Sequence, residues 1–219
     1  MIGKRKSSGW LVVAALLIGG VSAVAAQNPP PNVRPAPKPK PKDAAPPVPP
    51  SPEQSLESNW KAAATPGREH KILEGLVGRW KGHVVVRVNP NRVSEESDAT
   101  SEGTMILGGR YVQVTHKGTL GGQPFEGVML IGYDNIAKKY VGQWIDNMGT
   151  SIVHYDGTYD TRLKRLFMGA RFVDPMTRQP VKVRAMTTFV DPSNWTYEEF
   201  STPDGGKEWQ SLKITFTKG

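Results

Sequence analysis

The segment Gly118–Thr150, GTLGGQPFEGVMLIGYDNIAKKYVGQWIDNMGT, decides the fold. It predicts two long strands, Phe125–Tyr133 and Lys139–Asp146, because both are rich in the aromatic and β-branched residues that favour pleated strands. Between them, Asp134–Lys138 predicts a tight turn, since Asp and Asn side chains bond to the nearby backbone. We therefore expect an antiparallel hairpin with related elements on either side.

Segments of similar length and pattern flank this hairpin. A first strand begins at Trp80, where apolar residues alternate with polar ones. Val93–Ser101 is mostly polar and predicts a long connection. The remaining predicted strands are Gly103–Leu107, Tyr111–Lys117, Ser151–Tyr159, Leu163–Phe172, Val181–Val190, Trp195–Ser201 and Trp209–Thr217. About ten short strands without a long helix between them predict a mainly β protein. Because successive hairpins must hide their edges, a closed up-and-down antiparallel barrel is favoured over an open sheet.

Two short helices are predicted before the barrel. Ser51-Pro52-Glu53-Gln54 has the pattern of a capped helix start, and Pro66-Gly67 ends that helix. A second helix is expected over Glu69–Leu76. The domain organisation is thus a helical lead-in at 53–65 and a barrel at 66–219.

The N-terminus has the pattern of an export signal. Lys4-Arg5-Lys6 precedes the apolar run Trp10–Val21, and Val24-Ala25-Ala26 offers small residues for cleavage. Residues 1–26 therefore predict a signal peptide and an exported protein, periplasmic or secreted. The alternative is an uncleaved membrane anchor, although the apolar segment is short for one.

Composition divides the chain further. Of the 19 prolines, 12 lie between Pro29 and Pro52, so 27–52 predicts an extended Pro/Lys-rich tether, a spacer or a contact to envelope components. The net charge is +8, yet the chain from Glu53 onward holds 21 Lys and Arg against 19 Asp and Glu, or +2. A domain without a basic stripe is a poor candidate for nucleic-acid binding. The absence of cysteine excludes disulfides and thiolate metal sites.

The chain resembles a known bacterial family over roughly Pro66–Lys218. Gly78-x-Trp80 after a short helix is similar to the barrel opening of lipocalins and other calycins, where the Trp plugs the closed end. Longer runs resemble the family called domain of unknown function 1579: His70–Trp80, Met105–Tyr111, Gly122–Gly127, Gly132–Asn135, Lys139–Tyr140, Trp144–Asp146, Met148–Thr150 and Asp204–Lys207. The resemblance implies a calycin-like β-barrel. It implies no reaction or ligand, because none is established for the family.

A barrel of this size can hold one small ligand. Alternation groups Tyr140, Trp144 and Asp146 on one face, and glycines at 127 and 142 would leave space beside them. If these faces point inward, they line an apolar cavity with a carboxylate at one end; alternatively, the aromatic residues are packed core and the barrel is full. The candidate ligand-binding residues are Trp80, Phe125, Met129, Tyr140, Trp144, Asp146, Arg184 and Glu198.

The polar candidates are fewer. Arg184 and either Glu198 or Glu199 could meet across adjacent strands, buried as a ligand-orienting pair or exposed as a surface pair. The four histidines have no metal-binding spacing, so no metal or cofactor is predicted. A related barrel family binds haem through one histidine, which His116 or His154 could do only if inward-facing.

Three functions remain open. The first is an exported protein that binds a small, mainly apolar molecule in the barrel. The second is a hydrolase- or isomerase-type enzyme that uses the same cavity, and a raised pKa of an interior carboxyl would favour it. The third is a structural envelope domain with a filled barrel.

Overall fold

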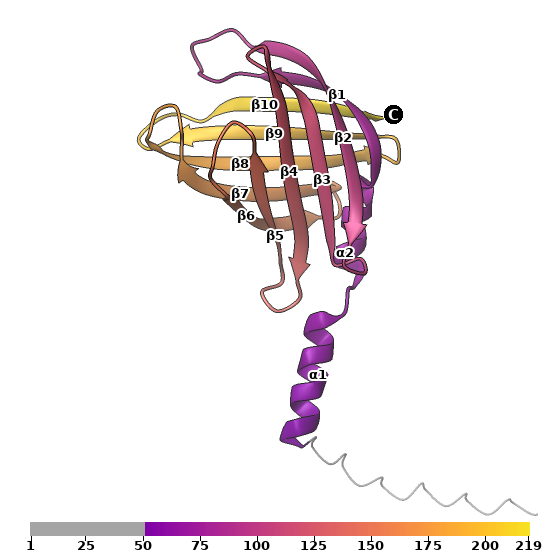
Figure 1. Cartoon of the computed structure of the whole chain (residues 1–219). Coiled ribbons are helices and arrows are strands. Elements are labelled where there is room, and N and C mark those ends of the chain that lie inside the picture. The colour runs from indigo at the N-terminus through magenta and orange to yellow at the C-terminus, as the bar shows by residue number, and fades with distance from the viewer. Residues whose placement is uncertain (1–50) are drawn as a thin grey trace, which may run out of the picture. The chain divides into compact units, whose positions relative to one another are not determined.

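The computed structural model describes residues 51–219, and its main feature is a closed ten-stranded antiparallel barrel (Figure 1). The predicted signal segment and nearly all of the tether lie outside these residues. Each strand pairs with its neighbour in sequence, and β1 and β10 close the barrel. The elements are α1 Pro52–Ala64, α2 Arg68–Ile72, the 3₁₀ helix η1 Leu73–Leu76, β1 Gly78–Val86, β2 Glu95–Ile106, β3 Tyr111–Leu120, β4 Gln123–Asp134, β5 Lys139–Asp146, β6 Val153–Asp160, β7 Arg165–Val173, β8 Pro180–Asp191, β9 Asn194–Pro203 and β10 Trp209–Lys218.

The central hairpin forms as predicted, from β4 and β5. Tyr133 lies opposite Tyr140, and Gly127 lies opposite Asp146. The turn is held by Asp134, whose Oδ1 accepts hydrogen bonds from the backbone N–H groups of Ile136 and Ala137 at 2.7 and 2.9 Å. The carboxylate thus supplies the turn bonds that the sequence indicates.

The predicted helix starts are also confirmed. Ser51 caps α1, and the Gln54 side chain completes a capping box. The second predicted helix divides into α2 and η1, which cover one end of the barrel. Among residues 51–219 no helix combines the length and apolar character needed to cross a membrane.

One predicted connection is wrong. Part of Val93–Ser101 belongs to β2, which begins at Glu95 and pairs with β1 along its length. The segment lacks a strand pattern because its inward positions are small residues, such as Ser97, Ala99 and Ser101, and its outward positions are polar. The apolar alternation that reveals most strands is therefore missing here.

The close approach of η1 to β2 depends on Gly103. A Cβ atom at this position would overlap Leu76 O and lie 2.9 Å from its carbonyl carbon. We expect Gly103→Ala to lower the free energy of unfolding by about 2–3 kcal/mol, since the backbone of η1 would have to move. Gly169→Ala is the matched control, because its nearest neighbouring atom would be an ordinary 3.8 Å away. Urea unfolding of both variants tests this; equal stabilities would contradict the close approach.

Candidate functional site: the open half of the barrel

The inner face of the barrel has two halves. In the first, the closed half, α2 and η1 lie against the strand ends, and the Tyr140 hydroxyl donates to Glu69 O at 2.8 Å. The Trp80 indole N–H likewise donates to Leu76 O at 3.1 Å. The inward side chains here are buried: Trp80, Val112, Ile131, Tyr140, Leu166, Met168, Trp195 and Phe216. These side chains form a packed core, and a surface groove lined by Tyr159 and Phe189 lies at the same end of the barrel.

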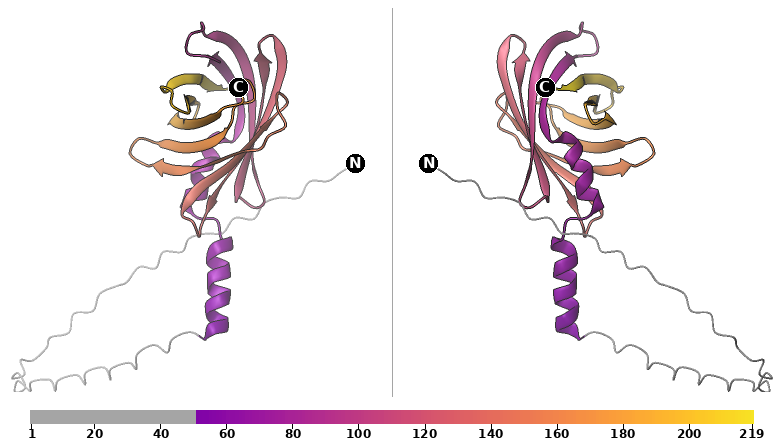
Figure 2. Two further views of the ribbon diagram at one scale, coloured as in Figure 1. Left: turned by 90° about the vertical axis from the view of Figure 1, so that its left-hand side faces the viewer. Right: turned by 90° about the vertical axis from the view of Figure 1, so that its right-hand side faces the viewer.

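At the other end, the open half, many inward side chains keep part of their surface exposed. Figure 2 shows the strands curving around this shared interior. Phe125 lies near the start of β4 and Trp144 near the end of β5, so both are at this end of the central hairpin. Tyr197 lies on β9 and Ile214 on β10. The inward residues that remain half-buried include Val84, His116, Phe125, Trp144, Phe172, Tyr197, Glu199 and Ile214. Val153, Tyr155, Val181 and Val183 are buried in the same half, so only part of its inner face is open to solvent.

Aromatic rings form one wall of the open half. Phe125 stacks on Trp144 with ring centroids 6.2 Å apart, and His116 lies 5.7 Å from Trp144 on the other side. The Trp144 ring covers Gly127, so the space predicted above that glycine is filled by Trp144 itself. The space beside Gly142 is likewise occupied, by Ile131 and Met168 at 3.5 Å.

Asp146 fixes this wall in place. Its Oδ2 accepts a hydrogen bond from the Trp144 indole N–H at 2.7 Å, and its Oδ1 accepts one from the backbone N–H of Met148 at 2.9 Å. Both carboxylate oxygens therefore have protein partners. Because both of its oxygens are engaged, Asp146 is better placed to hold the Trp144 ring in one orientation than to bind a ligand by itself.

A second polar group lies on β9 and β10. Glu199 Oε2 accepts from the Tyr197 hydroxyl at 2.9 Å, and Oε1 accepts from the Ser211 hydroxyl at 3.3 Å. Ser211 also contacts Ser201 Oγ at 3.0 Å, at the bulge where β10 shifts register against β9. Burial raises the pKa of Glu199, and it raises the pKa values of Tyr197 and Tyr155 as well, with the charge of Glu199 as the next contribution to both.

His116 also points inward, whereas His154 is exposed on the outer face. The Nδ1 atom of His116 and Oγ of Ser101 share a hydrogen bond of 2.9 Å. Burial lowers the pKa of His116 to about 4, so the ring is neutral at neutral pH. Residues 51–219 contain no group of three His, Cys, Asp or Glu side chains arranged to hold a metal.

The structure separates the predicted site residues into three places. Phe125, Trp144 and Asp146 come together in the open half, and Met129 lies beside Trp144 on the paired strand. Trp80 and Tyr140 belong to the closed half. The predicted pair on β8 and β9 is not formed.

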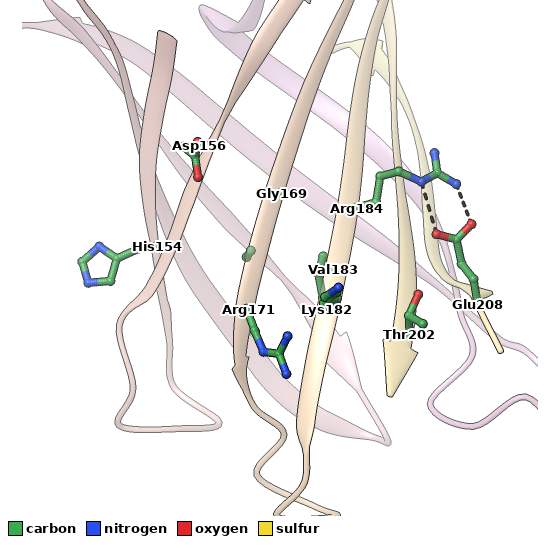
Figure 3. Close-up of a pocket in the computed structure, with 10 residues that line it drawn as sticks. His154, Asp156, Gly169, Arg171, Lys182, Val183, Arg184, Thr202 and Glu208 are labelled. Atoms are coloured by element: carbon green, nitrogen blue, oxygen red, sulfur yellow. Dashed lines mark hydrogen bonds and ion pairs between the residues drawn. The ribbon is translucent and has the colours of Figure 1, made fainter. Parts of the chain in front are cut away.

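Arg184 and Glu198 both lie on the outer face. Arg184 makes two hydrogen bonds to Glu208, of 2.8 and 3.2 Å (Figure 3). Its guanidinium also lies over the Phe200 ring, while Glu198 accepts a hydrogen bond from Gln210. Arg184 and Glu208 line a surface groove together with Gly169 and neighbouring outer-face residues. The guanidinium of Arg184 is thus already paired, and exposed pairs of this kind contribute little.

Sequence reasoning placed too little weight on Tyr197, Glu199 and His116. On β9 the inward positions are Trp195, Tyr197, Glu199 and Ser201. The alternation from Trp195 and Tyr197 is the signal that places Glu199, rather than its neighbour Glu198, inside the barrel. Phe200 is aromatic but points outward, so it obscures which residues of β9 alternate toward the interior.

Comparison with solved structures supports the fold alone. The S-type phycobiliprotein lyase CPES from Guillardia theta matches with 10% identity over 72% of this chain and 95% of that chain, at a TM-score of 0.49. Rv2717c from M. tuberculosis matches with 12% identity over 71% of this chain and 99% of that chain, at a TM-score of 0.52. At this identity the Rv2717c match shows a shared fold alone, a closed antiparallel barrel of the calycin-like kind that the sequence predicts.

Comparison with curated proteins gave no match. The family described as "Protein of unknown function (DUF1579)" matches residues 65–218, which include α2, η1 and all ten strands. This range also contains every side chain of the open half. The chain belongs to the DUF1579 family.

Proposed function

We propose that this protein is exported and binds one small, mainly apolar molecule in the open half of its barrel. The observation that carries the proposal is the partial exposure of Phe125 and Trp144 on the inner face of the open half, whereas Leu166 and Phe216 deeper in the barrel are fully buried. Since protein interiors pack closely, an inner face that solvent reaches is a place where a ligand can replace water. The basic and apolar pattern of the first 26 residues supports export.

The wall suits such a ligand. Phe125 and Trp144 offer parallel aromatic faces, and the bond from Trp144 to Asp146 holds the indole in one orientation. A wall fixed before binding lowers the entropy cost of association. Glu199 and its hydroxyl partners supply a polar end.

Native mass spectrometry of the full-length chain, purified from the exported fraction, tests the proposal. We expect a small molecule of defined mass to remain bound. A bare protein mass from several growth conditions would contradict it and favour a filled barrel with a structural role in the envelope.

Replacing Trp144 by alanine should weaken retention of that molecule by at least tenfold, because half of the aromatic wall is lost. Ile145→Ala is the matched control, since Ile145 is the outward neighbour on the same strand and is exposed. Circular dichroism should show both variants folded. If Trp144→Ala unfolds the barrel, Trp144 is core instead; if it folds and retains the molecule fully, the open half is not the site.

An enzyme is the second candidate function, and one observation favours it. Burial raises the pKa of Glu199, which is the direction of shift expected for a carboxyl that acts as a general acid or base. In that case the bound molecule should be converted on incubation with fresh protein, and Glu199→Gln should stop the conversion. Recovery of the molecule unchanged favours the binding protein.

A further inference from the structure

The charges of the barrel interior narrow the class of molecule that it can hold. In the open half the inner face carries two carboxyl groups, Asp146 and Glu199. Lysine and arginine residues of the ten strands alternate with the inward positions and so point outward. Lys218 is the exception, and it lies at the end of β10 in the closed half, 5.3 Å from the Trp80 ring. The open half therefore has acidic groups and no lysine or arginine partner for them within the described strands.

The two carboxyl groups differ in how much hydrogen-bond acceptor capacity remains free for a ligand. Asp146 uses both oxygens for Trp144 and Met148. Glu199 accepts one hydrogen bond at each oxygen, and the one from Ser211 is long at 3.3 Å. Since a carboxylate accepts about four hydrogen bonds, Glu199 retains acceptor capacity. None of the ion pairs within residues 51–219 involves it.

The residues around Glu199 also suit a ligand that donates hydrogen bonds. The hydroxyl groups of Tyr197 on the same strand and Ser211 on β10 donate to it. The Ser211 oxygen also accepts from Ser201 and retains one further acceptor position. Ala185 lies opposite on β8 and adds no charge. An anionic ligand would bring a second negative charge to a poorly solvated carboxyl group, at a large cost. A cationic nitrogen would be attracted and could donate to the free positions.

We propose that the ligand is a primary amine or related cation with an apolar body, recognised by Glu199, and not a fatty-acid-like anion. This inference rests on the proposed function, since it assigns the polar end of the same site. The apolar body would lie along Phe125 and Trp144, with the ammonium group at Glu199.

The test compares three probes that share one apolar chain: octylamine, octanol and octanoate. Each is titrated into the full-length protein at pH 7.5 by isothermal calorimetry, with tryptophan fluorescence as a second readout. We expect octylamine to bind at least tenfold more tightly than octanol, and octanoate to bind more weakly than both. Octanoate binding as tightly as octylamine overturns the inference, as does failure of all three to bind the folded protein.

Glu199→Gln and Glu198→Gln form a matched pair, because they make the same change on the inner and outer faces of one strand. Glu199→Gln should reduce octylamine affinity at least tenfold and leave octanol unchanged, whereas Glu198→Gln should change neither. Equal loss in both variants would overturn the assignment of Glu199. If Glu199→Gln does not fold, the order of the three probe affinities in the wild-type protein still tests the inference. Native mass spectrometry tests the proposed function separately. If the retained molecule is an acid, the assignment of an amine ligand is wrong, but the proposal that the barrel binds a small molecule stands.

Discussion

Replacing Trp80 by alanine is expected to lower the free energy of unfolding by about 3–5 kcal/mol, the range for removal of a buried aromatic side chain. Trp80 is only 3% exposed, and its indole N–H is bonded to Leu76 O. Its ring meets Trp195 edge-on at 5.9 Å, and Trp195 in turn stacks on Phe216. The substitution thus removes the contact that joins η1 to the core. For a domain of this size we expect the melting temperature to fall by roughly 10 °C.

Trp60→Ala provides the matched control. Trp60 lies on α1 and is 77% exposed, so the same chemical change should alter stability by no more than about 0.5 kcal/mol. Thermal unfolding followed by far-ultraviolet circular dichroism measures both variants. A loss below 1 kcal/mol for Trp80→Ala, or equal losses in the two variants, would show that the closed half does not depend on this residue.

The architecture could be predicted from the sequence because most strands carry strong local signals. The central hairpin has dense aromatic and β-branched residues, and Asp134 marks its turn, so β5 was predicted at its observed bounds, Lys139–Asp146. The start of β2 was missed for the opposite reason. Its inward residues are small and partly polar, so apolar side chains do not alternate with polar ones at the start of this strand.

The site was harder to predict than the fold because it depends on which side each strand turns inward. A shift of one position exchanges Glu198 for Glu199, and with it an outer-face residue for the interior carboxyl. Side-chain packing is a second reason why the site was hard to predict. Gly127 suggests empty space in the sequence, yet in the barrel the Trp144 ring lies over it. The alternation of Trp195 and Tyr197 indicates the phase of β9 only if the outward Phe200 is discounted, and the direction of the Trp144 side chain cannot be read from local pattern.

The interior polar groups have a shared physical cause. A barrel that is packed at one end and open at the other can tolerate titratable side chains only where some water or a ligand compensates for their burial. Glu199 and His116 both lie in that half, and burial shifts their pKa values in opposite directions, each toward the neutral form. Stability should therefore respond to pH through both residues, with opposite signs.

Acidification from pH 7 to pH 4.5 should destabilise the wild-type protein more than a His116→Gln variant, by about 2 kcal/mol. The unfolded chain binds a proton at His116 as the pH falls through 6.5, the ordinary pKa of histidine, whereas the folded protein keeps the ring neutral until about pH 4. Between these values the unfolded state binds more protons, so stability falls with the pH. Glu199 has the opposite effect, because its folded-state pKa is raised and the folded state gains protons first.

Comparing the two proteins isolates the histidine, because Glu199 and the remaining groups are present in both. Urea unfolding at pH 7 and pH 4.5 gives the loss of stability for each, and the difference between the two losses is the quantity predicted. His154→Gln is the control: this ring is exposed on the outer face, so its variant should lose as much stability on acidification as the wild type. Equal acid sensitivity of His116→Gln and wild type would mean that His116 becomes protonated in the folded barrel as readily as in the unfolded chain. The open half would then be far better solvated around His116 and Ser101 than the burial of the ring indicates.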